Sequence, residues 1–99
     1  MKNVTLYIDT SNSKKTMVAI ILDGKREEFT ADTQPETKSQ TVIPLLERVL
    51  KETHLKLKDI THIEVHPGPG SFTGTRVGVS VANALGWVLK IPVNGQKIA

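Results

Sequence analysis

The sequence predicts an α/β domain whose elements follow the order β-β-β-α-β-α-β. Three observations support this order. Two early runs rich in β-branched residues are followed by Asp23-Gly24, a pair typical of tight hairpins. The spacing of apolar residues then changes to a helical period between Val42 and Leu50. Finally, a glycine-rich segment, His66–Arg76, separates a short apolar run from a second helical pattern.

The first thirty residues are expected to form an antiparallel meander. Val4–Ile8 is β-branched and aromatic, and it stops at a polar cluster that begins with Asp9. Thr16–Leu22 is an almost continuous apolar run, typical of a strand covered on both faces. The segment from Lys25 to Ala31 is mixed and polar, which suits the edge of a sheet.

Two helices and two short strands are expected after the meander. The first helix has Ser39 as its N-cap and ends near Thr53. A short strand over Ile60–Val65, a second helix from about Thr73 to Leu89 and the start of a last strand at Ile91–Val93 follow. The apolar positions of the first helix are Val42, Leu45, Leu46, Val49 and Leu50.

Length and composition indicate one small domain, which we expect to span residues 1–99. A net charge of +3 with 38% hydrophobic residues excludes the disordered class. The absence of cysteine excludes a disulfide framework. Basic residues are dispersed along the chain, which disfavours direct nucleic-acid binding as the main role. Without a signal peptide or an apolar run of about 20 residues, the chain is expected to be cytoplasmic, with no membrane contact.

The glycine-rich segment is the first candidate for chemistry. Glycines permit positive φ and close approach, and free N–H groups at the start of a helix suit an anion. The segment is therefore either a phosphate cradle or a tight βα turn, and its spacing, which matches neither a P-loop nor GxGxxG, favours the turn. The candidate phosphate-binding residues are Gly68, Gly70, Ser71, Thr73 and Gly74.

Asp9 and Thr10, where the first strand ends, are the second candidate. An aspartate at this point either holds a metal–nucleotide or begins an Asx-turn, and the turn is favoured. His62 and His66 have the spacing of metal ligands on a helix, but on a strand they would lie about 13 Å apart. No metal site is expected.

The second helix carries more apolar surface than one sheet face can cover. Small residues recur every four positions at Gly74, Gly78, Ala82 and Gly86, beside an apolar ridge. A helix that is apolar around most of its circumference is buried on more than one side, against the first helix or against a partner. If a partner covers the surplus apolar surface, both helices are expected to contribute to the interface. Its residues are then Val42, Leu45, Val49, Val77, Gly78, Val81, Ala82 and Leu85.

Three segments together resemble one protein family. They are Ile8-Asp9-Thr10-Ser11, Lys38-Ser39-Gln40 and, above all, GPGSFTGTRVG from Gly68 to Gly78. The sequence is similar to the TsaB (YeaZ) family, the bacterial subunits required for threonylcarbamoyl modification of tRNA. The resemblance extends over nearly the whole chain, although Lys38 stands where the family usually has histidine.

The resemblance implies an RNase H-like (ASKHA) subdomain, with a five-stranded mixed sheet and two main helices. Family members carry a second subdomain after this one, and here we expect it to be absent. It implies a non-catalytic scaffold without a cofactor that acts on tRNA only indirectly. Such a scaffold pairs through its two helices with a TsaD-like transferase, is joined by a TsaE-like ATPase, and forms a homodimer when alone. Asp9, Thr10 and the glycine-rich segment are then vestiges of a phosphate site. The alternative is a nucleotide-binding or phosphotransfer domain of the wider ASKHA group.

Overall fold

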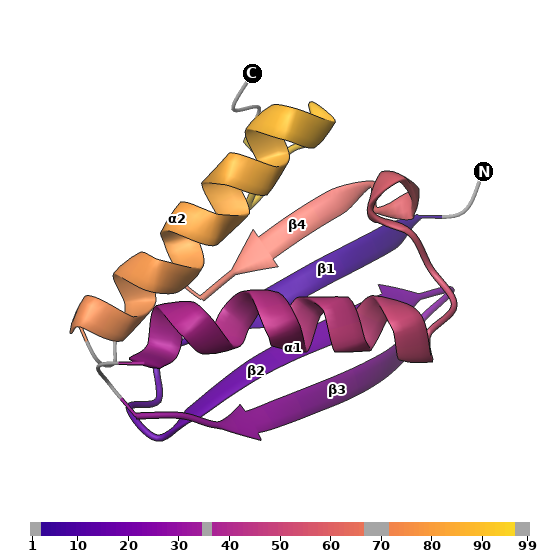
Figure 1. Cartoon of the computed structure of the whole chain (residues 1–99). Coiled ribbons are helices and arrows are strands. Elements are labelled where there is room, and N and C mark those ends of the chain that lie inside the picture. Colours follow the sequence, from indigo (N-terminus) through magenta and orange to yellow (C-terminus); the bar gives the residue numbers. More distant parts are fainter. Residues whose placement is uncertain (1–2, 35–36, 67–71, 97–99) are drawn as a thin grey trace.

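A computed structural model of the chain describes residues 3–34, 37–66 and 72–96. Their elements succeed one another in the predicted order through the second helix (Figure 1). The strands are β1 (Val4–Asp9), β2 (Lys15–Leu22), β3 (Lys25–Asp32) and β4 (His62–Val65). The helices are α1 (Lys38–Glu52), the short 3₁₀ helix η2 (Leu57–Asp59) and α2 (Phe72–Leu89).

The four strands form one mixed sheet in the order β3-β2-β1-β4. Strand β2 is antiparallel to both of its neighbours, whereas β1 and β4 run parallel. Asp23 and Gly24 connect β2 to β3 with φ angles of 53° and 78°, the positive values that a type I′ hairpin turn requires. The predicted meander is confirmed, with β3 at the edge of the sheet.

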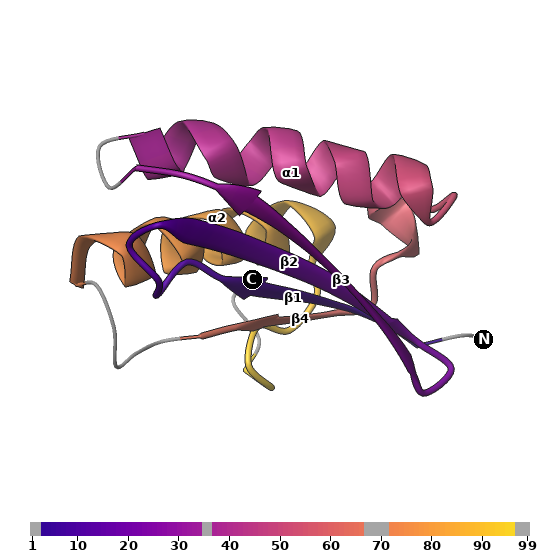
Figure 2. The same cartoon turned by 90° about the horizontal axis from the view of Figure 1, so that it is seen from below.

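Both helices pack on the same face of the sheet (Figure 2). Helix α1 covers β2 and β3, while α2 covers β4 and β1. Alternate residues of β1 and β4 are therefore buried, because only one face of these strands meets the helices. The largest fully buried side chains of the described residues are Leu6, Ile8, Ile63, Val18, Val42, Val49, Thr10 and Thr16.

Helix α1 begins one residue before the predicted N-cap, at Lys38, with Thr37 in the N-cap position. The first turn is joined to that residue by the hydroxyl of Thr41, which donates to the carbonyl of Thr37 at 3.0 Å. The prediction of Ser39 as N-cap was therefore wrong by two residues. The pattern located the helix, but hydroxyl residues at 37, 39 and 41 all offered a possible start.

Each main helix ends on a non-glycine residue in the left-handed conformation. His54 follows α1 with a φ of 58°, and Lys90 follows α2 with the same value. After α1, the N–H of Leu55 donates to the carbonyl of Leu50 at 2.9 Å, and that of Ile91 donates to Gly86 at 3.1 Å after α2. These bonds are the Schellman closure, in which the chain turns sharply away from the helix axis.

The predicted fifth strand is reduced to a single bridge between Val93 and Ile63. Among the described residues the sheet has four strands, not five. The chain turns back immediately after Val93, because Asn94 and Gly95 adopt φ angles of 50° and 79°. Ladder pairing is continued by a side chain, since the amide of Asn94 accepts from the N–H of Val65 at 2.9 Å and donates to its carbonyl at 3.1 Å.

Candidate functional site

The predicted phosphate segment lies only partly within the described residues. Gly68, Gly70 and Ser71 fall outside them, and their role stays a prediction. Thr73 and Gly74 belong to the first turn of α2, which begins at Phe72. The strand before the segment and the helix after it are confirmed.

Asp9 closes a local turn at the end of β1. Its Oδ1 accepts hydrogen bonds from the backbone N–H of Ser11 at 2.9 Å and from the Ser11 hydroxyl at 2.6 Å. This arrangement is an Asx-turn, in which the carboxylate satisfies the chain's own backbone. Of the two interpretations of Asp9, the geometry favours the turn.

Thr10 and Gly78 are brought together by the tertiary structure although they are far apart in the sequence. The hydroxyl of Thr10 is fully buried and accepts a hydrogen bond from the N–H of Gly78 at 3.1 Å. A Cβ at Gly78 would lie 2.5 Å from that hydroxyl oxygen, a distance that real side chains do not tolerate. The glycine therefore allows α2 to approach the end of β1.

Most of the predicted interface residues belong instead to the core. Val42, Val49 and Ala82 are completely buried and Leu45 nearly so, while Gly78 packs on Thr10. The prediction that these five residues form a docking surface is corrected, because the small-residue column of α2 and the main stripe of α1 both face the sheet. Val77, Val81 and Leu85 are half-buried at the border between core and surface.

An apolar groove lies outside the core, where α2 passes beside α1. It has a volume of about 330 Å³. Val88 is 72% exposed at its rim, and Trp87, the next residue along, is 62% exposed. The lining residues are Ile43, Ser80, Val81, Ala84, Leu85 and Val88. Ile43 and Ala84 were missed from sequence, since each lies beside the main apolar stripe of its helix rather than on it.

The sheet face that the helices leave uncovered is mixed in character. On it, the guanidinium of Arg26 lies 4.9 Å from the centre of the Tyr7 ring and forms a 2.6 Å ion pair with Glu28. Burial raises the pKa of the Tyr7 hydroxyl above its ordinary value, and Asp9 adds to that effect, while Arg26 opposes it. This face therefore combines an aromatic ring with charges of both signs.

Metal-ligating groups do not gather anywhere in the described part of the chain, where no three His, Cys, Asp or Glu side chains are placed to hold an ion. Neither of the two long helices, over the residues that the structure describes, has the length and apolar character to cross a membrane.

The chain is similar to proteins of known families. A family model described as "TsaD: tRNA N6-adenosine threonylcarbamoyltransferase" matches residues 32–95. The tRNA threonylcarbamoyladenosine biosynthesis protein TsaB of Bacillus subtilis is 33% identical over 90% of the chain. The chain belongs to the family that this model describes, and within it to the TsaB (YeaZ) proteins. The TsaB of Buchnera aphidicola is 29% identical over 96% of the chain.

A solved structure agrees with the TsaB assignment. YeaZ from Pseudomonas aeruginosa superposes with a TM-score of 0.83 at 27% identity, covering 92% of this chain and 41% of that one. The chain spans 38% of the Bacillus subtilis TsaB and 44% of the Buchnera protein, less than half of either. The four-stranded sheet and two helices described above are therefore an arrangement shared with YeaZ.

Proposed function

We propose that the chain is a non-catalytic, TsaB-like interaction subunit that supports threonylcarbamoyl transfer to an adenosine of tRNA through a TsaD-like partner. The names of its relatives support the process, and the match to the TsaD family model supports kinship with the partner. Two related chains can join through equivalent surfaces, as the copies of a two-fold dimer do. The contact with tRNA is then indirect.

The groove between α1 and α2 is the observation that carries this proposal. Its lining is almost wholly apolar, and Val88 and the adjacent Trp87 are largely exposed. Exposed apolar patches of a few hundred Å² mark interaction surfaces, because leaving them in water costs free energy. Two helices laid against two others can bury about 800 Å² per partner, the area of a standard stable interface. Ile43 places α1 in the same surface as α2.

The same surface serves a homodimer when the partner is absent, and a TsaE-like ATPase is the third component of the proposed assembly. We assign the fold to the RNase H-like (ASKHA) class, with residues 1–99 as one subdomain equivalent to the N-terminal one of TsaB. A cytoplasmic location, where tRNA is modified, belongs to the same proposal.

Copurification with the TsaD-like subunit of the same organism tests the proposal. The wild-type chain is expected to form a stable complex. Ala84→Arg should weaken that complex at least about tenfold, because it places a charge in the apolar groove. Asn83→Arg is the matched control, since Asn83 is exposed on the same helix but does not line the groove.

Circular dichroism should show that both variants are folded. If Ala84→Arg binds the TsaD-like subunit as well as Asn83→Arg does, the groove is not the interface. Failure of the wild-type chain to bind would refute the interaction role itself.

A further inference from the structure

A second pocket lies at the C-terminal end of α1, where the course of the backbone leaves part of the sheet without a helix above it. Helix α1 ends at Glu52, and the left-handed His54 turns the chain away toward η2. The hairpin of β2 and β3 continues past this point to Leu22. The helix layer therefore stops before the strands do, and a pocket of about 200 Å³ remains over the uncovered part of the sheet.

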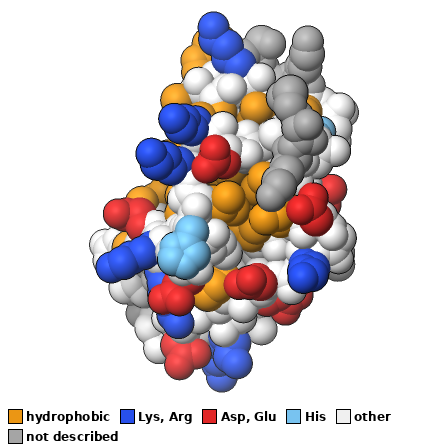
Figure 3. Space-filling view, turned by 90° about the vertical axis from the view of Figure 1, so that its right-hand side faces the viewer, with side chains coloured by type: hydrophobic (Ala, Val, Ile, Leu, Met, Phe, Trp, Pro, Cys, Tyr) orange, Lys and Arg blue, Asp and Glu red, His pale blue; other side chains and the backbone are white. Residues whose placement is uncertain are grey.

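The floor of this pocket is apolar and its walls are charged. Ile20 and Leu22 of β2 form the floor, and their partners in the sheet register, Glu27 and Lys25 of β3, form one wall. The end of α1 forms the other wall. Figure 3 shows this side of the molecule, where hydrophobic side chains are exposed in the middle and charged side chains of both signs surround them.

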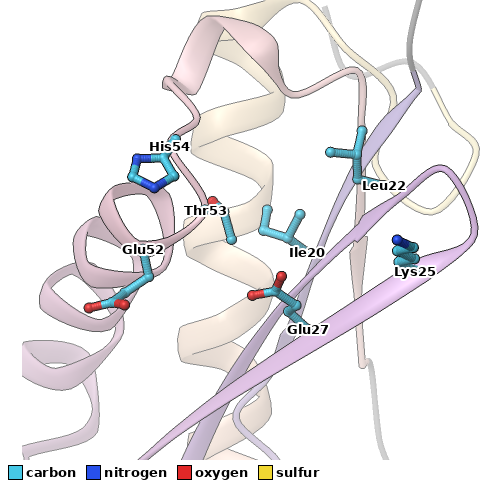
Figure 4. A pocket seen from close by; sticks show the side chains of 7 residues that line it. All are labelled: Ile20, Leu22, Lys25, Glu27, Glu52, Thr53 and His54. Atoms are coloured by element: carbon cyan, nitrogen blue, oxygen red, sulfur yellow. The ribbon is translucent and has the colours of Figure 1, made fainter.

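The charged groups of the pocket have no partners among the described residues. The ion pair that these residues contain joins Arg26 to Glu28, on the opposite face of β3. In Figure 4 the side chains of Ile20, Glu27 and Thr53 converge on the same space, whereas Glu52 points away from it. Glu27 is thus an unpaired carboxylate that stands directly beside an apolar floor.

We propose that this pocket binds a primary alkylammonium group, with the ammonium at Glu27 and its carbon stem on Ile20 and Leu22. The carboxylate of Glu27 and the negative end of the α1 dipole face the pocket, and the nearby Glu52 adds negative charge although its side chain points away. Together they outweigh the single ammonium of Lys25, so the pocket favours a cation. Ligand sites for larger molecules have volumes of about 300–1,000 Å³. The smaller space fits a stem of about four or five carbons, which packs on apolar surface while its charged end stays hydrated.

This chemistry is shared by a free aliphatic diamine and by a lysine side chain of another protein. The proposal does not depend on the groove between α1 and α2, because the two share no lining residue. Binding of an amine and binding of a TsaD-like subunit can therefore succeed or fail separately.

Titration of the ¹⁵N-labelled chain with n-pentylamine, followed by NMR, tests the pocket. Saturable shifts are expected at the amides of Ile20, Glu27 and Thr53. Neutral 1-pentanol should bind at least about fivefold more weakly, because it lacks the charge that pairs with the carboxylate. Glu27→Gln should weaken amine binding by a similar factor, and Glu52→Gln by less.

Glu47→Gln is the matched control, because Glu47 is exposed on α1 and does not line the pocket. Equal binding of 1-pentanol and n-pentylamine, or unchanged binding after Glu27→Gln, would overturn the proposal. Cadaverine and N-acetyl-lysine methylamide distinguish the two sources: tighter binding of the former supports a free diamine, and of the latter a protein lysine.

Discussion

At the scale of single residues, the contact between Thr10 and Gly78 determines how α2 meets the sheet. Gly78→Ala introduces a Cβ at 2.5 Å from the Thr10 hydroxyl oxygen, so α2 must shift or the hydrogen bond must break. We expect the free energy of unfolding to fall by about 1–3 kcal/mol, as for other overpacked sites. Urea denaturation measures the change, and Ser80→Ala on the exposed side of α2 should alter stability by less than about 0.5 kcal/mol.

The double variant identifies the contact as the cause. Thr10→Ala removes the atoms that the new Cβ would strike, so Gly78→Ala should cost less in that background than in the wild type. Contacting residues show such coupling, whereas distant ones add independently. If the effects of the two substitutions on the free energy of unfolding are strictly additive, the destabilisation by Gly78→Ala does not come from its contact with Thr10.

His54 is a second residue whose conformation does not suit its side chain. It closes α1 with a φ of 58°, a region that glycine enters without steric cost and other L-residues do not. His54→Gly should therefore raise the free energy of unfolding by about 1 kcal/mol, the usual gain from an improved helix cap. Thermal unfolding measures the gain.

Lys90→Gly provides an independent repeat of the same argument. Lys90 has the same φ at the end of α2 and should give a gain of the same sign, additive with the first because the two sites share no contact. If both His54→Gly and Lys90→Gly lower the free energy of unfolding, the left-handed conformation of these two residues does not destabilise the wild-type chain.

At the scale of elements, α2 is a helix with two different apolar faces. Its small residues Gly78 and Ala82 pack toward the sheet, whereas Ala84 and Val88 line the exposed groove. Ala82→Arg should leave the chain unfolded, because an unpaired charge would enter a core position that is 0% exposed. Ala84→Arg carries the same side chain two residues away and should fold.

Circular dichroism and thermal melts compare these two variants. A folded Ala82→Arg chain that only loses association would mean that the small-residue column faces a partner after all, and the packing of α2 described above would have to be revised.

At the scale of the whole molecule, the end of β1 has its polar groups committed to the fold. Asp9 Oδ1 accepts two hydrogen bonds from Ser11, and the Thr10 hydroxyl accepts one from Gly78, so both residues have a structural role at this point. Isothermal titration calorimetry with ATP and Mg²⁺ is expected to show no binding in the micromolar range. A micromolar dissociation constant would favour the alternative function, a nucleotide-binding domain of the ASKHA group, over the interaction subunit.

Much of the architecture could be predicted from local patterns. The Asp23-Gly24 pair favours a type I′ turn, which joins two antiparallel strands, and it adopts the positive φ angles of that turn. The helical spacing from Val42 to Leu50 located α1 and its apolar stripe. It did not show that Val42, Leu45 and Val49 lie in the core, since these residues were predicted to form an interface. The absence of a full last strand could not be predicted in the same way. There the side-chain amide of Asn94, instead of a backbone group, pairs with Val65, and the two residues are 29 positions apart.

The sequence by itself therefore determined the first four strands and the two main helices, their order, the meander and the family, since each of these depends on neighbouring residues or on a contiguous motif. Only the tertiary structure decided which apolar face of α2 is buried. Periodicity shows that Ala82 and Ala84 lie on different sides of a helix, but not which side meets a sheet. That choice depends on Thr10, which accepts a hydrogen bond from Gly78 across 68 positions of the chain and draws the small-residue side of α2 onto β1. The groove of Ala84 and Val88 is what this packing leaves exposed.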